Sequence, residues 1–275
     1  YYMKRWFAAP DSALAAELDG ELVGSNFLTA WGSVAFFGPL SVRPELWNRG
    51  IAGRLVEATV ERFDKQHIRQ AGLYTFSNSA KHHGLYQKYG FWPRFLTPIL
   101  TRQVGGLQRG APEITRYTSL SAADQEKAIE GCRQLTATAF EGLDLEREIR
   151  AVGRLALGEV ILLDDLSGLA GMAVCHIGAG TEAGSDFCYV KFGMVRPGPG
   201  AADRLDALLG ACEALATSQG AHEVELGINT ARHEAYRTVL ARGYRVGTVG
   251  VGVAMHRPNE QGYSRPGVWV VDDWR

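Results

Sequence analysis

A small-residue loop that opens a helix is the first stretch of this 275-residue sequence that could do chemistry. Residues 48–54 read NRGIAGR, where Gly50 and Gly53 leave the backbone N–H groups uncovered by bulky side chains. The first N–H groups of a helix are unpaired and lie at the positive end of its dipole, so they attract anions. Arg49 and Arg54 add positive charge beside them. The pattern predicts a pyrophosphate site, although a glycine pair before a helix can also be only a turn.

Two common phosphate-binding loops do not fit this stretch. A Walker loop ends in Gly-Lys-Ser or Gly-Lys-Thr, and that ending is not present here. A dinucleotide fingerprint needs three spaced glycines and an acidic residue about 20 positions later, and the spacing here differs. A phosphate-binding role therefore requires a third kind of loop.

The loop lies between a strand and an amphipathic helix. Residues 36–42 are mostly apolar and β-prone, and Gly38 and Pro39 interrupt them, which predicts a bulge or a splayed strand. Arg43 and Pro44 end the strand. The helix after the loop has an apolar face made of Ala52, Leu55, Val56, Val60 and Phe63.

A second strand and helix lie at residues 72–92. Leu73–Phe76 predicts a short strand, and Ala80–Tyr89 predicts a helix that ends at Gly90 in a C-cap position. Tyr86 is the residue of this helix that could donate a proton. A helix tyrosine can also simply pack, with its hydroxyl at the surface.

These two segments resemble motifs A and B of the GNAT-type N-acetyltransferases. VRPELWNRGIAGRLV is similar to motif A, in which Gly-x-Gly/Ala holds coenzyme A pyrophosphate; Gly50 and Ala52 match that pair. Trp47 stands where the family usually has Gln or Arg. LYQKYGF is similar to motif B, which implies that Tyr86 lies near the thioester sulfur and that Ser79 takes the place of the helix-start Asn. The cofactor-binding residues that the resemblance implies are Leu40, Ser41, Val42, Asn48, Arg49, Gly50, Ile51, Ala52, Gly53, Arg54, Ser79 and Tyr86.

The same order of elements begins again in the second half of the chain, which changes the expected fold. A strand ending Val195-Arg196-Pro197 repeats Val42-Arg43-Pro44, and a helix, a strand, a helix and a last strand come after it. We therefore expect an α/β (α+β) protein with two tandem GNAT-like domains, each a mixed, mostly antiparallel sheet flanked by helices. The expected boundaries are an acetyl-CoA-binding domain at 1–102, a linker at 103–113, a second domain at 114–256 and a tail at 257–275.

The second half lacks the groups that carry the chemistry in the first. Aligning Gly50 with Gly200 leaves the second loop three residues shorter, without an arginine before its glycine. Aligning Gly90 with Gly243 puts Val239 at the place of Tyr86, and valine cannot donate a proton. We therefore expect a degenerate second domain. Tyr236 and Asn229 lie close to Val239 in the sequence, so a catalytically active second domain stays an alternative.

Composition narrows the class of protein. The net charge of −1 and the pI near 6.7 do not favour nucleic acid as a partner. The four cysteines, without CxxC spacing, predict free thiols in a reducing cytoplasm, and no residue group has metal-ligand spacing. No apolar run has the length of a membrane span, so we expect a cytoplasmic protein without a membrane partner. The start, YYMKRWF, has no initiating Met and reads like the end of a helix, so we expect the beginning of the first domain to be missing.

The resemblance implies acetyl-CoA as cofactor and attack of a primary amine on its thioester. The amine acceptor can be a small molecule or a peptide, and a homodimer is one expectation for the assembly. The backbone near Leu40–Val42 would polarise the carbonyl, and Tyr86 would donate a proton to the leaving thiolate. The base stays open between His82, His83, Glu45 and a water chain, because the central strand has no carboxylate. The alternative is a non-catalytic acyl-CoA-binding or regulatory module, since fold does not fix function.

Overall fold

The computed structural model describes residues 1–105 and 114–275. It is a mixed α/β fold, as predicted, and hydrogen bonding orders the strands β1-β2-β3-β4-β11-β5-β10-β9-β8-β7-β6, with β12 beside β9. Contacts divide the chain into two compact units. The first comprises Tyr1–Arg94, Gly252–Glu260 and Trp274–Arg275, and the second comprises Phe95–Val251 and Gln261–Asp273.

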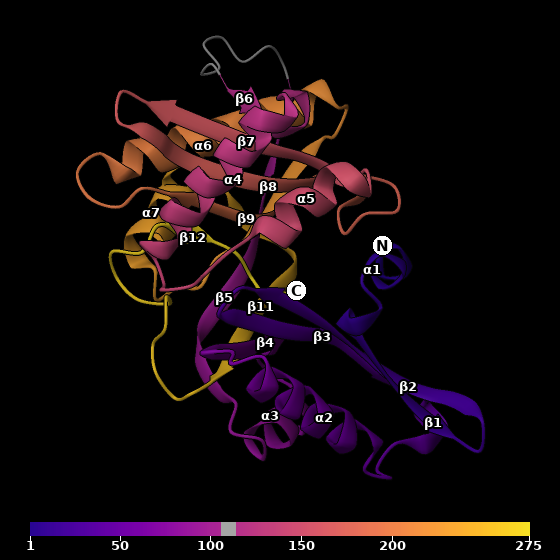
Figure 1. The fold of residues 1–275 in the computed structure, drawn as a ribbon. Coiled ribbons are helices and arrows are strands. Elements are labelled where there is room, and N and C mark those ends of the chain that lie inside the picture. The colour runs from indigo at the N-terminus through magenta and orange to yellow at the C-terminus, as the bar shows by residue number, and fades with distance from the viewer. Residues whose placement is uncertain (106–113) are drawn as a thin grey trace. The chain divides into compact units, whose positions relative to one another are not determined.

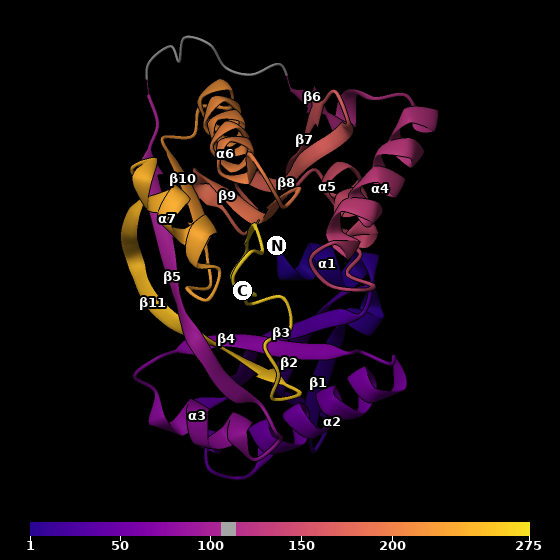
Figure 2. The same cartoon turned by 90° about the vertical axis from the view of Figure 1, so that its left-hand side faces the viewer.

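The first unit is built on a short sheet with two helices along one face (Figures 1 and 2). Its elements are α1 (Tyr2–Ala8), β1 (Ala13–Leu18), β2 (Glu21–Trp31), β3 (Val34–Val42), α2 (Ile51–Lys65), β4 (Gln70–Phe76) and α3 (Ala80–Gln87). Strands β1, β2 and β3 are antiparallel, and β3 and β4 are parallel. The apolar face predicted for α2 is the one that packs, burying Leu55, Val56 and Phe63.

The second unit has helices on both faces of its sheet (Figure 2). Its elements are β6 (Thr115–Arg116), α4 (Ala122–Ala137), α5 (Glu146–Arg154), β7 (Gly158–Asp165), β8 (Gly168–Gly178), β9 (Gly184–Val195), α6 (Ala201–Ser218), β10 (Glu223–Gly227), α7 (His233–Ala241) and β12 (Val270–Val271). Strands β9 and β10 are parallel, and β9, β8, β7 and β6 are antiparallel in turn. Helices α4 and α5 cover one face, and α6 and α7 cover the other.

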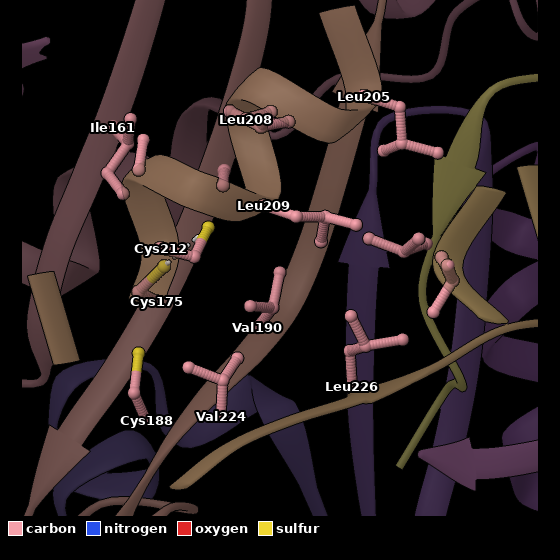
Figure 3. Packing of buried hydrophobic residues seen from close by; sticks show 14 of the residues in the cluster. Ile161, Cys175, Cys188, Val190, Leu205, Leu208, Leu209, Cys212, Val224 and Leu226 are labelled. Atoms are coloured by element: carbon pink, nitrogen blue, oxygen red, sulfur yellow. Dashed lines mark hydrogen bonds between the residues drawn. The ribbon is translucent and has the colours of Figure 1, made fainter. Parts of the chain in front are cut away.

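The main core of the second unit lies under α6 (Figure 3). Leu205, Leu208 and Leu209 of α6 pack on β-strand residues such as Val190 and Leu226. All four cysteines of the chain are free thiols and are buried, and Cys175 Sγ lies 3.8 Å from Cys212 Sγ within this core. In the middle of α6 residues 208–213 are all buried, so the helix is enclosed on every side there, which accounts for its broad apolar surface.

The two units differ from the predicted domains because two long strands run through both of them. In β5 (Trp92–Gln103), the first residues belong to the first unit, whereas Ile99–Gln103 pair with β10 of the second. In β11 (Arg245–Arg257), Gly252–Arg257 pair with β4 of the first unit. Residues 95–103 of β5 thus belong to the second unit and residues 252–257 of β11 to the first, which local sequence patterns do not reveal. Most of the predicted linker, residues 106–113, lies outside the described residues, and Gln103 still belongs to β5.

None of the described helices is long and apolar enough to cross a membrane.

Candidate active site

The two parallel strands of the first unit separate soon after they meet. Strand β3 pairs with β4 only at Val34, Ala35 and Phe36, although β3 continues to Val42. The β2–β3 register shifts near Gly38, opposite the segment between Asn26 and Leu28. The bulge or splay predicted from Gly38 and Pro39 is thus present, and one edge of β3 beyond Phe36 has no partner strand in the described part of the chain.

Backbone groups on that edge point away from β2. Arg43 N–H donates to Val23 O of β2 at 2.9 Å, so the alternation of an antiparallel strand turns the peptide groups of Val42 and Leu40 to the open side. Val42 O confirms the direction, because it accepts a hydrogen bond from the Trp47 indole at 2.9 Å. Ser41 is on the alternate set and pairs with Ser25. Of the three strand residues predicted to bind the cofactor, Leu40 therefore offers its N–H and C=O on the open side and Val42 offers its N–H, since Val42 O is bonded to the Trp47 indole.

Helix α2 begins with uncovered N–H groups. Its N-cap is Gly50 in the left-handed conformation, with φ of 82°, no side-chain cap and no acidic residue in the first turn. A Cβ at Gly50 would meet no atom within 4 Å, so the approach to this helix end is open. Asn48 is also left-handed, with φ of 64°, and turns the chain into the helix. Ile51, Ala52 and Gly53 form the first turn, as the motif predicted, and the helix end suits an anion.

Arg49 and Arg54 line a hollow of about 420 Å³ beside this helix end. The other lining residues come from β1, β2 and α2 and are mostly apolar; they are Leu14, Ala15, Ala16, Glu17, Leu18, Val23, Ile51, Leu55 and Ala58. Arg43, by contrast, is held 2.7 Å from Glu21. Arg49 and Arg54, unlike Arg43, form no ion pair among the described residues.

The segment that leads into α2 contacts the α3 segment at two places that the sequence did not predict. A Cβ at Gly53 would lie 2.9 Å from the Tyr89 hydroxyl, so the missing side chain at Gly53 leaves room for that hydroxyl beside α2. The Lys81 ammonium at the start of α3 lies 4.5 Å from the centre of the Trp47 ring. Trp47, which replaces the expected Gln or Arg, thus bridges the end of β3 and the start of α3.

Tyr86 lies where the strands part. Its ring is buried and meets the ring of Phe37, the first β3 residue beyond the paired segment, edge to face at 5.7 Å. Burial raises the pKa of Tyr86 to about 12, so the phenol keeps its proton at any pH near neutral. The hydroxyl is not among the enclosed polar atoms that lack a partner, and no hydrogen bond to the described residues fixes it.

The three side chains predicted as candidate general bases lie in different surroundings. His82 is half-buried on α3, and its ring stacks on Tyr86 with centroids 6.1 Å apart. His83 Nε2 lies 3.3 Å from Phe76 O, at the end of β4. Glu45 lines a different hollow, near the turn between β1 and β2 with Asp19 and Glu21. Ser79 is the N-cap of α3, as expected, but its side chain makes no capping bond.

The opposite face of the same sheet carries a buried histidine. His256 of β11 pairs with Gly72 of β4, and its ring meets Trp274 at 5.9 Å. A Cβ at Gly72 would lie 2.2 Å from the Trp274 ring, so this glycine makes room for the indole. Burial lowers the pKa of His256 to about 4, with Arg94 acting in the same direction, so the imidazole is neutral.

The second unit has the same strand separation, but its own chain fills it. Strand β9 pairs with β10 only from Phe187 to Val190 and continues to Val195. Beyond that point β12 pairs with β9, Val270 with Met194 and Val271 with Gly193. A Cβ at Gly227 of β10 would lie 2.2 Å from Asp273 Cβ, so the tail packs against both strands.

The helix end of the second unit is also occupied. Gly200, with φ of 76°, starts α6 as Gly50 starts α2. Here Asp203 lies in the first turn, and Arg204 donates to Arg196 O at 2.8 Å across the loop. A negative charge and an internally bonded guanidinium replace the open, positively charged helix end of the first unit.

Comparisons with known proteins agree with these features. Residues 1–91 match the profile of the acetyltransferase (GNAT) family, and this segment is therefore a GNAT domain, as the two motifs predicted. A solved structure from Pyrococcus horikoshii has a TM-score of 0.69 at 14% identity, covering 98% of this chain and 81% of its own. A GCN5-related N-acetyltransferase from Sphaerobacter thermophilus has a TM-score of 0.59 at 19% identity, covering 97% of this chain and 86% of its own.

A third structure, a GCN5-related N-acetyltransferase from Anabaena variabilis, has a TM-score of 0.57 at 15% identity, over 93% of this chain and 65% of its own. At these identities the likeness concerns the fold, and it extends over nearly the whole chain. A comparison with curated protein sequences gave no match.

Proposed function

We propose that the protein is an acetyl-CoA-dependent N-acetyltransferase that transfers an acetyl group to a primary amine by direct attack on the thioester. The first unit carries the cofactor and the chemistry. The family match of residues 1–91 supports the general class, and the arrangement of this unit supports the detail.

The observation that supports the proposal is the edge of β3 that has no partner strand among the described residues, with Tyr86 at one end and the α2 loop near the other. From Phe37 to Val42 the strand spans about 16 Å, at about 3.3 Å per residue. A pantetheine arm is an extended chain with two amides, and it can hydrogen-bond to the N–H and C=O of Leu40 and to the N–H of Val42 as an added strand does. Its pyrophosphate would then meet the N–H groups of Gly50–Gly53, with Arg49 and Arg54 beside them.

In this arrangement the residues have separate roles. The backbone of β3 holds the arm and orients the acetyl group, which lowers the entropic cost of reaction. Tyr86, protonated throughout the physiological range, donates a hydrogen bond to the sulfur as negative charge develops there. The amine attacks the carbonyl carbon, the C–N bond forms, the C–S bond breaks, and amide and coenzyme A thiol leave.

Release of free thiol tests the proposal. The protein is incubated with acetyl-CoA and a panel of small amines, amino acids and peptides, and thiol is followed with a colorimetric thiol reagent. The expected result is thiol release that requires both protein and one class of amine. Tight acetyl-CoA binding without amine-dependent release across the panel would instead support a non-catalytic acyl-CoA-binding module.

A further inference from the structure

His82 is the titratable side chain packed directly on Tyr86. The two residues lie one turn apart on α3, with ring planes inclined by 29° and centroids 6.1 Å apart. One imidazole nitrogen, Nδ1, is enclosed without a hydrogen-bond partner among the described residues, whereas Nε2 is not one of the enclosed atoms that lack a partner. The neighbouring His83 differs, because its Nε2 lies 3.3 Å from Phe76 O. Of the two adjacent histidines, His82 is thus the one whose ring contacts Tyr86.

The proposed reaction needs a proton for the leaving sulfur, and Tyr86 is a poor source of it. A thiol has a pKa of about 8.5. A phenol with a pKa of about 12 binds its proton more tightly than the thiolate does, so Tyr86 can donate a hydrogen bond but gives up its proton reluctantly. The two strands that separate, β3 and β4, contain no Asp or Glu that could serve instead.

We propose that His82 carries a proton from the attacking nitrogen to the leaving sulfur. The inference rests on the proposed function. When the neutral amine attacks, the C–N bond forms and the nitrogen becomes positively charged. Neutral His82 takes one proton from that nitrogen at Nε2. The C–S bond then breaks, and the imidazolium gives the same proton to the thiolate, which leaves amide, coenzyme A thiol and neutral His82.

The surroundings of His82 favour this role. Burial lowers its pKa below the usual 6.5, and the charges of Lys81 and His83 on the same helix lower it further. His82 is therefore neutral at pH 7 and able to accept a proton. Once protonated, it is a stronger acid than the coenzyme A thiol, so delivery to sulfur is favourable. Tyr86 lies beside it and orients the sulfur.

The first test uses turnover with an amine from the panel that is already neutral across the pH range scanned. We expect His82→Gln to lower kcat about 100-fold while the KM for acetyl-CoA stays within about 3-fold. The acidic limb of the kcat profile disappears in this variant, and free imidazole restores part of the activity of His82→Ala. The matched control is His233→Gln, at the exposed start of α7, and it should behave like the unchanged protein. Equal kcat in His82→Gln, or a loss that imidazole does not restore and that keeps the acidic limb, would overturn the inference.

The second test needs no acceptor. The ring signals of His82 are followed by NMR against pH, with coenzyme A and with desulfo-coenzyme A, which lacks only the thiol. We expect coenzyme A alone to shift the His82 titration, because the sulfur lies beside the ring. Equal titrations with both ligands would contradict the inference even if the enzyme turns over. If the protein binds neither ligand, the proposed function itself fails, and calorimetry distinguishes that outcome.

Discussion

Strands β3 and β4 of the first unit stop pairing after three residues, and strands β9 and β10 of the second stop after four. In both units a left-handed glycine then starts the next helix. The units differ in how the separated edge is used. The edge of β3 has no partner strand in the described residues, whereas β12 pairs with β9. A splayed pair of strands thus becomes a candidate binding edge in one repeat and a docking place for the chain's own tail in the other.

The same contrast extends to charge. The α2 loop has two arginines without ion pairs in the described chain and no acid in its first turn. The α6 loop has Asp203 in its first turn, and Arg204 bonds to loop carbonyls. Each change would weaken an anion site, so the start of α6 suits an anion less well than the start of α2 does. Substitutions in each unit test whether the two units differ in this way.

The largest expected effect concerns the tail of the second unit. Arg232 Nη1 lies 2.7 Å from Asp272 Oδ1, both side chains are buried, and the Tyr263 hydroxyl donates to Asp272 Oδ2 at 2.6 Å. Asp272→Ala leaves the Arg232 charge buried and unpaired, which should cost about 3–5 kcal/mol of unfolding free energy in a urea titration. Glu126→Gln, at an exposed ion pair with Arg150, should have little effect. A stable Asp272→Ala would mean that the tail is only loosely held in place.

Acid should act on the first unit at a higher pH than on the second. Burial lowers the pKa of His256 from 6.5 to about 4. Its contribution to the unfolding free energy is therefore complete above pH 6.5 and is lost as the pH falls toward 4. The loss amounts to about 3 kcal/mol. In the second unit burial would raise the pKa of Glu182, but Lys191 and His176 lower it to about 2, so its contribution is lost only between pH 4.5 and 2.

Unfolding free energy measured at pH 7, 5.5 and 4.5 checks this order. The unchanged protein should lose stability across these values, and His256→Gln should flatten the dependence. A variant that keeps the full pH dependence would show that another group of the molecule is responsible.

Removing the phenol should lower catalysis in the first unit alone. Tyr86→Phe deletes a hydrogen bond to a sulfur that develops charge, so kcat should fall about 10- to 100-fold with little change in KM. Tyr236→Phe on α7, the tyrosine close to the corresponding place in the second unit, should stay within about 2-fold. Steady-state thiol release measures both. A larger loss in Tyr236→Phe would assign the chemistry to the second unit.

The smallest expected effect concerns the contact between the loop and α3. Lys81 and the Trp47 ring are exposed, and such a cation–π contact is weak. Lys81→Gln should raise the Kd for acetyl-CoA about 2- to 5-fold, with Lys88→Gln on the same segment as the unaffected comparison. Unchanged affinity in Lys81→Gln would show that the contact between Lys81 and Trp47 does not help to bind acetyl-CoA.

Much of the first site could be predicted because its signals are local. The Gly50 helix start, the Gly38-Pro39 interruption and Tyr86 can each be read from a few neighbouring residues, and the structure has the helix start and the separated strand where they were expected. The role of these residues in binding and catalysis stays a prediction. The replacement of the usual Gln or Arg by Trp47 was visible in the sequence, but its hydrogen bond to Val42 O depends on a loop geometry that no pattern encodes.

The features that sequence reasoning missed all depend on distant segments. Gly72 is an ordinary strand glycine until Trp274, 202 positions later, is found against it. The sequence predicts only a tail at 257–275, because Val270 and Val271 are too few to predict a strand, and their partner is β9. The division of β5 and of β11 between the two units was missed for the same reason. Strands that pair over long sequence separations show no local periodicity that would identify the partner.

Calorimetric titration with acetyl-CoA tests the central difference between the two units most directly. It should be run on the unchanged protein, on Gly50→Glu and on Gly200→Glu, which place the same charge and the same backbone strain at the two equivalent helix starts. The account predicts one site per chain, at least 100-fold weaker in Gly50→Glu and unchanged in Gly200→Glu. Two sites per chain, or one site that survives Gly50→Glu and is lost in Gly200→Glu, would contradict it.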